Sequence, residues 1–242
     1  MIKLELSPKP TELTEELQDN LTQEFKNNPD ISVWDIAWLK EAVWEKSHKK
    51  CCYSEIYLKR ASTYPEIEHF HPKKLYPDEV LSWENLLPSC KKCNATKGSH
   101  DTVKEPIINP FVDNPKDYFY FDNSFYRARE NNEKAKLSIK KLGLNDIEHF
   151  VEDRDDISKH AKARLKDLYK IIVFHNDFSS IESLKQFLDT GNRKTKYSAL
   201  VSSVILSDVN FQNIENQLKK NNLWDNELEE LKQELEYCAL LR

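Results

Sequence analysis

The residues best suited to chemistry lie between positions 48 and 98, with the pair Glu68-His69 at their centre. A carboxylate can hold a hard divalent cation, and a neutral imidazole beside it can take a proton from water. Such a pair by itself is more often an ordinary surface feature. Here Asn85-Leu86 and then Cys93-Asn94 follow it at short intervals, and this combination favours metal-assisted hydrolysis.

Four of the five cysteines form two tight pairs, which predict a zinc site. Cys90 and Cys93 have the spacing of a zinc-knuckle half, in which two intervening residues let both thiolates reach one ion. The upstream half is imperfect, because Ser54 stands where its second cysteine is expected. His48, separated from Cys51 by two residues, restores the spacing, and the predicted zinc ligands are therefore His48, Cys51, Cys90 and Cys93. Two alternatives stay open: Cys52 replaces one ligand, or the cysteines are buried or reduced thiols without metal.

The composition indicates a folded and mainly helical protein. Of the 242 residues 39% are hydrophobic and 32% are charged, and only three are glycine. Few glycines with many Leu, Lys and Glu favour helix over an all-β fold. We find neither a long apolar run nor a leader pattern, so we expect no membrane association and a cytoplasmic location. Thiols stay reduced in the cytoplasm, which favours metal binding over disulfides.

Charge is unevenly distributed along the chain. The formal net charge is −5, yet positions 46–104 hold eleven Lys or Arg against seven Asp or Glu, so this segment is near +4 and the rest near −9. A basic segment in an acidic chain predicts a phosphate-binding surface. Random surface charge explains the same numbers equally well.

Two helices are predicted before the candidate site. Apolar spacing predicts the first over 11–26, ended by Asn27-Asn28-Pro29-Asp30. Ser32 is the predicted N-cap of the second, with Asp35 three residues on as a capping-box acid. Short strands are expected near 56–57 and 66–70, and a helix is expected to open at 94–97.

The rest of the chain predicts a hairpin and a helical lobe. Aromatic segments at 118–121 and 124–127 flank Asp122-Asn123, which is typical of a hairpin. Gly143 and Gly191 are expected to cap helices. Predicted helices cover 133–141, 146–172, 181–189, 194–206, 211–220 and 227–241. We therefore divide the chain into an N-terminal helical segment (1–47), a core with the candidate chemistry and the hairpin (48–130), and a helical lobe (131–242).

The ordered set of site residues resembles the HNH endonucleases, which are built on the ββα-metal motif. The pattern of that family is an acid–His pair, an Asn-Leu step, and Cys-x2-Cys followed by Asn or His and then Lys-Gly. This chain has, in the same order, Glu68-His69, Asn85-Leu86, Cys90-x2-Cys93-Asn94 and Lys97-Gly98. The resemblance implies an α+β, mostly helical fold with a small ββα-metal core and a zinc knuckle, N-terminal helices and a C-terminal helical lobe.

A wider similarity points to one bacterial subfamily, the PtuB-type nucleases of Septu anti-phage systems, some of which occur in retron operons. It covers roughly 48–154 and includes Pro72-Lys73, Asn109-Pro110, the aromatic hairpin, Leu142–Asn145 and Arg154. This resemblance implies a defence effector controlled by a Septu-type (PtuA-like) ATPase, in some systems within a retron complex. The chain has no phosphate-binding G-x4-G-K-[ST] run, so the ATPase would be another chain.

The resemblance also assigns roles to individual residues. His69 would be the general base that deprotonates the attacking water. Glu68 and Asn94 would hold one divalent cation, Mg²⁺ or Mn²⁺, which offsets charge that develops on the phosphate. Asn85 would orient His69 by a hydrogen bond near it.

Contacts to nucleic acid are predicted for Lys73, Lys97 and His71. His71 would face the same side of a strand as His69, although a position tolerant of polar residues is the commoner interpretation. Tyr53, Tyr64 and Trp83 are candidates to stack on bases, with packing the commoner role. The substrate is DNA or RNA, including tRNA, because the motif acts on the phosphodiester and does not read the base.

Two other functions remain open from the sequence. A zinc-knuckle module could bind nucleic acid without cutting it, but it would have no use for Glu68, His69 and Asn94 together. A helical adaptor with a decayed nuclease motif is the other, and Ser54 slightly favours it. Metal content and cleavage assays separate these possibilities.

Overall fold

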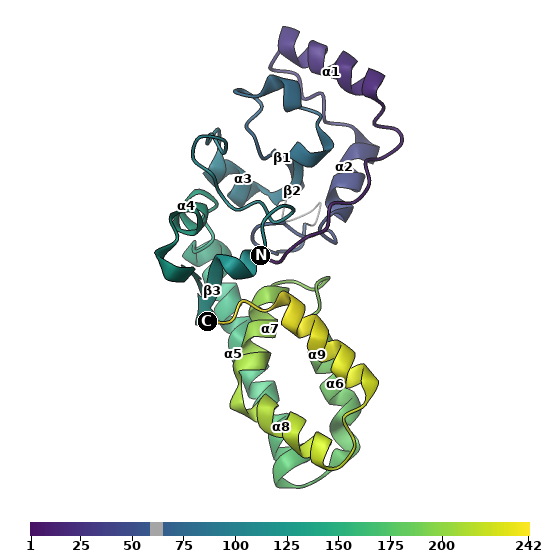
Figure 1. The fold of residues 1–242 in the computed structure, drawn as a ribbon, viewed down its shortest axis with the longest axis vertical. Helices are drawn as coiled ribbons and strands as arrows, with labels where there is room; N and C mark the ends of the chain where they lie inside the picture. The colour runs from purple at the N-terminus through teal and green to yellow at the C-terminus, as the bar shows by residue number, and fades with distance from the viewer. Residues whose placement is uncertain (59–64) are drawn as a thin grey trace. The chain divides into compact units, whose positions relative to one another are not determined.

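A computed structural model describes residues 1–58 and 65–242 of the chain (Figure 1); Tyr64 lies outside the described residues. The fold is α+β and mostly helical, as predicted. It consists of two compact units, and the three-segment division made from the sequence stays a prediction. The first unit contains Met1, Lys3–Asn114 and Glu130–Leu144, and the second contains Ile2, Pro115–Arg129 and Asn145–Arg242.

Two helices open the first unit. Helix α1 (Glu15–Asn27) begins after Thr14, whose hydroxyl accepts a hydrogen bond from the Leu17 N–H and caps the helix. Helix α2 (Ala37–Glu45) starts later than predicted and has no side-chain cap. Ser32 as its N-cap is wrong, because the Ser32 carbonyl instead accepts from the Asp35 N–H in a turn that precedes the helix.

A strand pair and a short helix lie at the centre of the first unit. Strand β1 (Pro65–His69) pairs antiparallel with β2 (Leu86–Cys90), with Glu68 opposite Leu87 and His69 opposite Leu86. Helix α3 (Lys91–Lys97) follows β2 directly and packs on both strands. The strand predicted near 56–57 is reduced to a single bridge between Lys50 and Tyr57.

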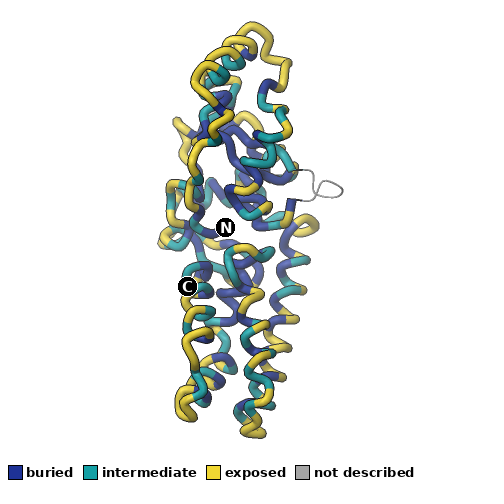
Figure 2. The backbone as a smooth tube through the Cα atoms, turned by 90° about the vertical axis from the view of Figure 1, so that its right-hand side faces the viewer, coloured by how far each residue is buried: buried dark blue, intermediate teal, exposed yellow. Residues whose placement is uncertain are grey.

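Apolar side chains from α1, α2 and the strand pair form one core, and Figure 2 shows the buried segments in dark blue. It comprises Leu13, Phe25, Val33, Leu39, Val43, Ile67, Val80, Leu81, Trp83 and Leu86. Burial of each large side chain stabilises the fold by roughly 1.5–3 kcal/mol. Val80 and Leu81 thereby anchor the loop that returns from β1 to β2. This loop includes the short turns η1 (Pro77–Glu79) and η2 (Trp83–Asn85), and α4 (Glu133–Lys141) completes the unit.

The second unit contains the predicted hairpin and a helical bundle. Strands β3 (Phe119–Asp122) and β4 (Phe125–Ala128) confirm the hairpin. Short turns flank it at η3 (Pro115–Asp117) and η4 (Arg129–Asn131). The helix predicted over 146–172 is observed as continuous helical segments with π-helical turns at both ends, η5 (Ile147–Val151), α5 (Glu152–Tyr169) and η6 (Lys170–Phe174). The other helical elements are η7 (Phe178–Ser180), α6 (Ile181–Asp189), α7 (Ser198–Ser207), α8 (Val209–Lys220) and α9 (Asn226–Cys238).

A separate apolar core holds this bundle together. Its buried members include Leu165, Leu188, Phe211 and Leu235. Among the residues with a described structure, no helix has both the length and the apolar character needed to cross a bilayer.

Candidate active site and metal sites

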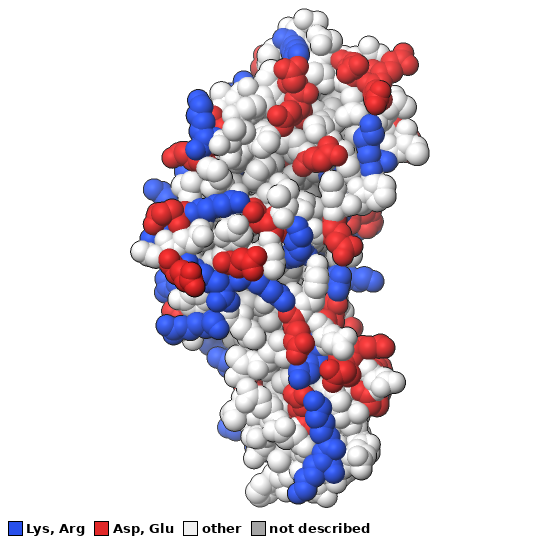
Figure 3. All heavy atoms as spheres, in the orientation of Figure 1, with Lys and Arg blue, Asp and Glu red and all other residues white. Residues whose placement is uncertain are grey.

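A cavity of about 290 Å³ lies at the end of β1 and is lined by several predicted site residues. Strand β1 supplies Glu68 and His69, α3 supplies Asn94, and the loop after β1 supplies Lys73 and Lys74. The structure therefore brings the predicted base, both predicted metal ligands and one predicted phosphate contact to one place. On the face shown in Figure 3, basic and acidic side chains are interspersed. Lys73 and Lys74 are therefore candidates for phosphate binding because they line the cavity.

His69 is fixed in one tautomer by the backbone. Its Nε2 lies 2.9 Å from the Val80 carbonyl oxygen. Since a carbonyl can only accept, Nε2 carries the hydrogen and Nδ1 is left as the basic nitrogen. The ring of Trp34 packs edge-on, 4.7 Å away between ring centroids. Burial, together with the positive charge of Lys73, lowers the pKa of His69 to about 3, so the ring is neutral at physiological pH.

Glu68 is buried beside a buried lysine. Its Oε1 lies 2.6 Å from Lys97 Nζ, and that ammonium also donates to the His69 carbonyl at 2.9 Å. Burial raises the pKa of Glu68 to about 7, although the charge of Lys97 acts in the opposite direction. Glu68 Oε1 nonetheless has no hydrogen bond of good geometry within the described chain. Lys97 is only 3% exposed, so its position here serves Glu68, and its predicted contact with a phosphate stays a prediction.

Asn94 has a carboxylate partner that the sequence analysis missed. Its Nδ2 donates to Glu66 Oε2 at 2.6 Å, which leaves Oδ1 available as a ligand oxygen. Glu66 and Glu68 are two residues apart in β1, so their side chains lie on the same face of the strand. This spacing is the sequence signal that could have identified Glu66 as a site residue. Carboxylate and amide oxygens are ligands that Mg²⁺ and Mn²⁺ prefer. The Glu68 carboxylate and Asn94 Oδ1 therefore form a donor set that suits a hard cation, although Glu68 Oε1 is already paired with the Lys97 ammonium.

Asn85 forms hydrogen bonds with the backbone of the segments near His69 rather than with the imidazole ring itself. Its Oδ1 accepts from the His71 N–H at 2.7 Å, and its Nδ2 donates to the carbonyls of His71 and Glu79, each at 3.1 Å. The next residue, Val80, supplies the carbonyl that holds the His69 ring. Asn85 is thus a positioning residue for the loop that fixes the imidazole.

His71 does not join His69 in the cavity. Strand β1 ends at His69, so the side alternation that predicted a shared face stops there. His71 Nδ1 instead donates to Glu79 Oε2 at 2.6 Å, and its side chain lines a different cavity. The expectation that His71 and His69 share a face is therefore corrected.

Three cysteines form a buried thiol cluster. The sulfur atoms of Cys51, Cys90 and Cys93 all lie within 4.8 Å of one another, an arrangement that can hold a metal and is consistent with zinc. Two turns build the cluster in the same way, because the Ser54 N–H donates to Cys51 Sγ and the Cys93 N–H to Cys90 Sγ, each at 3.5 Å. Burial opposes ionisation, but hydrogen bonds from the neighbouring thiols and Ser54 hold the pKa of Cys51 well below its ordinary value.

The fourth side of the cluster belongs to Ser54, whose Oγ lies 3.7 Å from Cys90 Sγ. His48 is not among the described residues that complete the cluster, so the predicted His48 ligand is corrected. It lies in a left-handed turn after α2, with a φ of 54°, and the spacing rule assumed an ordinary knuckle there. Cys52 also lies outside the group of three neighbouring sulfur atoms. Its backbone N–H pairs with the Pro88 carbonyl of β2.

Comparison with known proteins identifies the relatives of this chain. No protein-family model matches it. A "Septu protein PtuB" of Bacillus thuringiensis is 35% identical over 240 residues, which covers 96% of this chain and 92% of that protein. A second "Septu protein PtuB", from Bacillus mycoides, is 26% identical over 187 residues, which covers 64% of this chain and 61% of that protein. Because the first similarity spans nearly the whole length of both proteins, this chain belongs to the Septu PtuB family.

Proposed function

We propose that the chain is the metal-dependent nuclease of a Septu anti-phage defence system and hydrolyses phosphodiester bonds in DNA or RNA. The observation that carries the proposal is the cavity at the end of β1, where a neutral imidazole lies beside two oxygen ligands. Its supporting framework, two antiparallel strands followed directly by a helix, has the order of a ββα-metal motif. The relatives named Septu protein PtuB supply the defence context.

In this proposal His69 Nδ1 accepts a proton from the attacking water. The Val80 carbonyl keeps the ring in the tautomer that allows this step. Glu68 and Asn94 would hold Mg²⁺ or Mn²⁺, which when bound offsets the negative charge of the phosphate. Lys73 and Lys74 attract the phosphate to the cavity. Burial and the charge of Lys73 keep the imidazole neutral, which leaves Nδ1 without a proton and able to accept one.

Zinc at the thiol cluster would have a structural role. Cys90 ends β2 and Cys93 lies in α3, while Cys51 belongs to the turn after α2. An ion bound to all three thiolates would fix the start of α3 against the rest of the first unit. Asn94 is the next residue of α3, so its position depends directly on this anchor.

We further propose that a Septu-type (PtuA-like) ATPase restrains the nuclease. Unrestrained cleavage of nucleic acid would harm the host cell. The chain lacks a phosphate-binding loop sequence, so ATP would bind to the partner. In some systems this pair would act within a retron complex.

The test is a cleavage assay with the purified chain, alone and with the ATPase partner. Plasmid DNA and total tRNA are incubated separately with Mg²⁺, Mn²⁺ or EDTA. We expect cleavage of one polymer that requires the divalent cation, and the better-cut polymer identifies the substrate class. Absence of cleavage in every combination would contradict the proposal.

A non-cleaving nucleic-acid-binding module or adaptor is the alternative. One observation favours it: the Lys97 ammonium already lies 2.6 Å from Glu68 and partly neutralises the carboxylate without any metal. Zinc content together with nucleic-acid binding and no cleavage would establish the alternative.

A further inference from the structure

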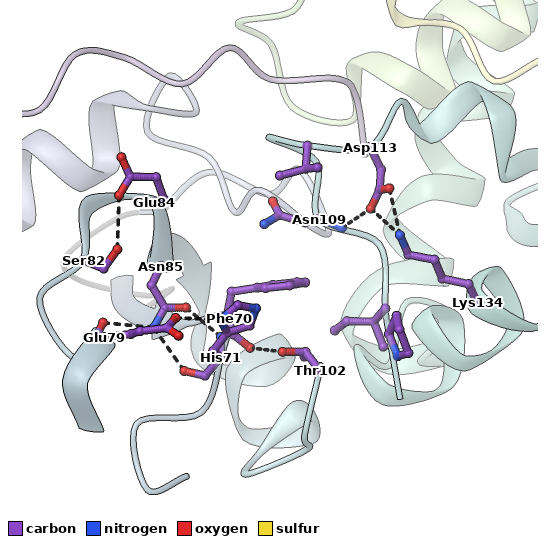
Figure 4. Close-up of a pocket in the computed structure, with 13 residues that line it drawn as sticks. Phe70, His71, Glu79, Ser82, Glu84, Asn85, Thr102, Asn109, Asp113 and Lys134 are labelled. Atoms are coloured by element: carbon purple, nitrogen blue, oxygen red, sulfur yellow. Dashed lines mark hydrogen bonds and ion pairs between the residues drawn. The ribbon is translucent and has the colours of Figure 1, made fainter. Parts of the chain in front are cut away.

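A second cavity, of about 320 Å³, lies next to the candidate active site and has no role in the proposed hydrolysis (Figure 4). Phe70 and His71 line it, and these residues directly follow His69 of the first cavity. The segment 69–73 therefore contributes to the walls of both cavities, which makes them neighbours. Ligand pockets range over roughly 300–1,000 Å³, so this cavity suits a small ligand.

The walls of this cavity combine apolar and polar groups. Phe70, Pro106, Ile107 and Val112 supply apolar surface, and Val112 is 75% exposed at the rim. An aromatic ring with aliphatic neighbours is the kind of surface on which a nucleobase stacks. Many polar groups around it already have partners, since Thr102 donates to the Phe70 carbonyl and Asp113 pairs with Lys134.

Asn109 is the exception among these polar groups. The residue is only 8% exposed, and its Oδ1 accepts from the Phe111 N–H at 3.0 Å. Its Nδ2 has no acceptor within the described parts of the chain. Figure 4 shows the amide on the side of the backbone away from the Asp113–Lys134 pair. The Nδ2 atom is not among the fully buried unpartnered atoms, so this donor is open to the cavity and can pair with an acceptor that a ligand supplies.

The charge of the lining disfavours a phosphate. Three carboxylates, of Glu79, Glu84 and Asp113, outnumber the single Lys134. Carboxylates accept hydrogen bonds from exocyclic amino groups, and asparagine amides pair with base edges that offer both a donor and an acceptor. A flat, neutral ligand with ring nitrogens and an amino group satisfies the apolar wall, the Asn109 donor and the carboxylate acceptors together.

We propose that this cavity receives one unpaired nucleobase of the substrate strand, a base with an exocyclic amino group, close to the scissile phosphate. The proposal rests on the proposed function, because it places the base beside the reacting phosphodiester. Base edges inside a duplex cannot enter such a cavity, so the substrate must be single-stranded or extruded at this point. Adenine, cytosine and guanine carry the amino group, whereas uracil and thymine do not.

The experiment measures binding in the full chain with His69→Ala, which needs no cleavage. Short single-stranded homopolymers of each base are titrated against this parent, against Phe70→Leu and against Asn109→Asp. The aspartate keeps the oxygen that accepts from Phe111 and replaces the NH₂ donor with a charged oxygen. The added charge acts on the backbone of every homopolymer alike, so the readout is the ratio of affinities between bases. Val103→Ala, an exposed site outside the cavity, is the matched control, and thermal unfolding verifies that each variant folds.

We expect the parent to bind at least one amino-bearing homopolymer about tenfold more tightly than oligo-U or oligo-T, within the discrimination typical of a base-edge contact. Asn109→Asp should reduce this preference to less than twofold, Phe70→Leu should weaken binding of the preferred base, and Val103→Ala should change neither. No preference in the parent, or an unchanged preference in folded Asn109→Asp, would overturn the proposal. Equally tight binding of the free nucleoside monophosphate would overturn the claim that the base belongs to a strand.

The outcomes also separate this proposal from the proposed function. Cleavage by the wild-type chain without base preference supports the nuclease and refutes the base-binding cavity. Base preference that Asn109→Asp abolishes, in a wild-type chain that never cleaves, supports base binding and refutes the nuclease.

Discussion

Lys97 joins two parts of the candidate site through one buried ammonium. It reaches from the last turn of α3 to the Glu68 carboxylate and to the His69 carbonyl. This contact fixes the end of β1 against α3 and neutralises a carboxylate that burial would otherwise force to take up a proton. The residue therefore has a structural task beside any part in phosphate binding.

Replacing Lys97 should reveal this task. Lys97→Met leaves Glu68 buried without its cation, and loss of one partner of a buried ion pair typically costs about 3–5 kcal/mol. We expect the free energy of unfolding to fall by about 3 kcal/mol, the low end of that range, because Glu68 can take up a proton when the cation is lost. Urea unfolding measures it. The double variant Glu68→Gln/Lys97→Met should recover part of the loss, and a single variant as stable as wild type would contradict the ion pair.

Ser54 lies beside the three thiols of the predicted zinc site, and we expect it to limit zinc affinity. Its backbone N–H and hydroxyl lie at the thiol cluster where a fourth ligand belongs. Ser54→Cys supplies a fourth thiolate and should tighten zinc binding by roughly tenfold or more, as measured by competition with a chromogenic chelator. Cys52→Ser is the matched control and should leave zinc affinity unchanged. If Cys52→Ser instead weakens zinc binding as much as Cys51→Ser does, the assignment of ligands is wrong.

At the residue scale, the sequence identifies the side chains that can act as ligands or bases, but it does not identify the groups that they contact. Spacing alone identified Cys51, Cys90 and Cys93 as one cluster. It could not place His48, because a left-handed turn interrupts the expected knuckle. Nor could it identify the Val80 carbonyl that holds His69, since a backbone group has no sequence signature and depends on the path of the loop.

At the element scale, Gly191 shows how packing overrides a local rule. Gly143 has the positive φ of 62° expected for a helix cap, whereas Gly191 has no such φ. The Gly191 cap is therefore corrected. A Cβ added at Gly191 would lie 2.3 Å from Leu235 Cδ2 and 2.8 Å from Ser202 Oγ. Side chains of α9 and α7 thus lie close to the backbone at Gly191, which a local pattern cannot indicate.

Gly191→Ala should therefore destabilise the second unit. Overpacking of a well-packed core costs about 1–3 kcal/mol, and we expect the thermal midpoint of that unit to fall by several degrees. Calorimetry of the full chain measures the change. Gly98→Ala is not a suitable control, because its φ of 53° adds backbone strain, so Val209→Ala on the exposed surface of α8 serves instead. Equal midpoints for Gly191→Ala and wild type would show that the contact relaxes freely.

Most helices could be predicted from apolar spacing, but not all of their starts. The helix over 181–189 was predicted at the observed bounds, because its apolar residues recur at helical spacing and form one buried face. Helix α2 begins five residues after Ser32, since the intervening Val33 is buried in the core and the Asp35 N–H closes a turn there. Tertiary burial here determines where the helix begins.

At the scale of the whole molecule, the described residues include an apolar core in each of the two units. Because the members of one core do not belong to the other, we expect the two units to unfold in separate transitions. Removal of zinc with a strong chelator should lower the midpoint of the first unit, where the thiol cluster lies, and Gly191→Ala should lower that of the second. A single transition that both changes shift together would contradict independent cores.

The measurement that tests the central claim most directly compares His69→Ala with His71→Ala in the metal-dependent cleavage assay. The two histidines lie two positions apart, but only His69 lines the cavity with Glu68 and Asn94. We predict that His69→Ala lowers the rate of cleavage at least 100-fold, within the range lost when a general base is removed. His71→Ala should still hydrolyse the phosphodiester. Cleavage by His69→Ala at the wild-type rate would contradict the account.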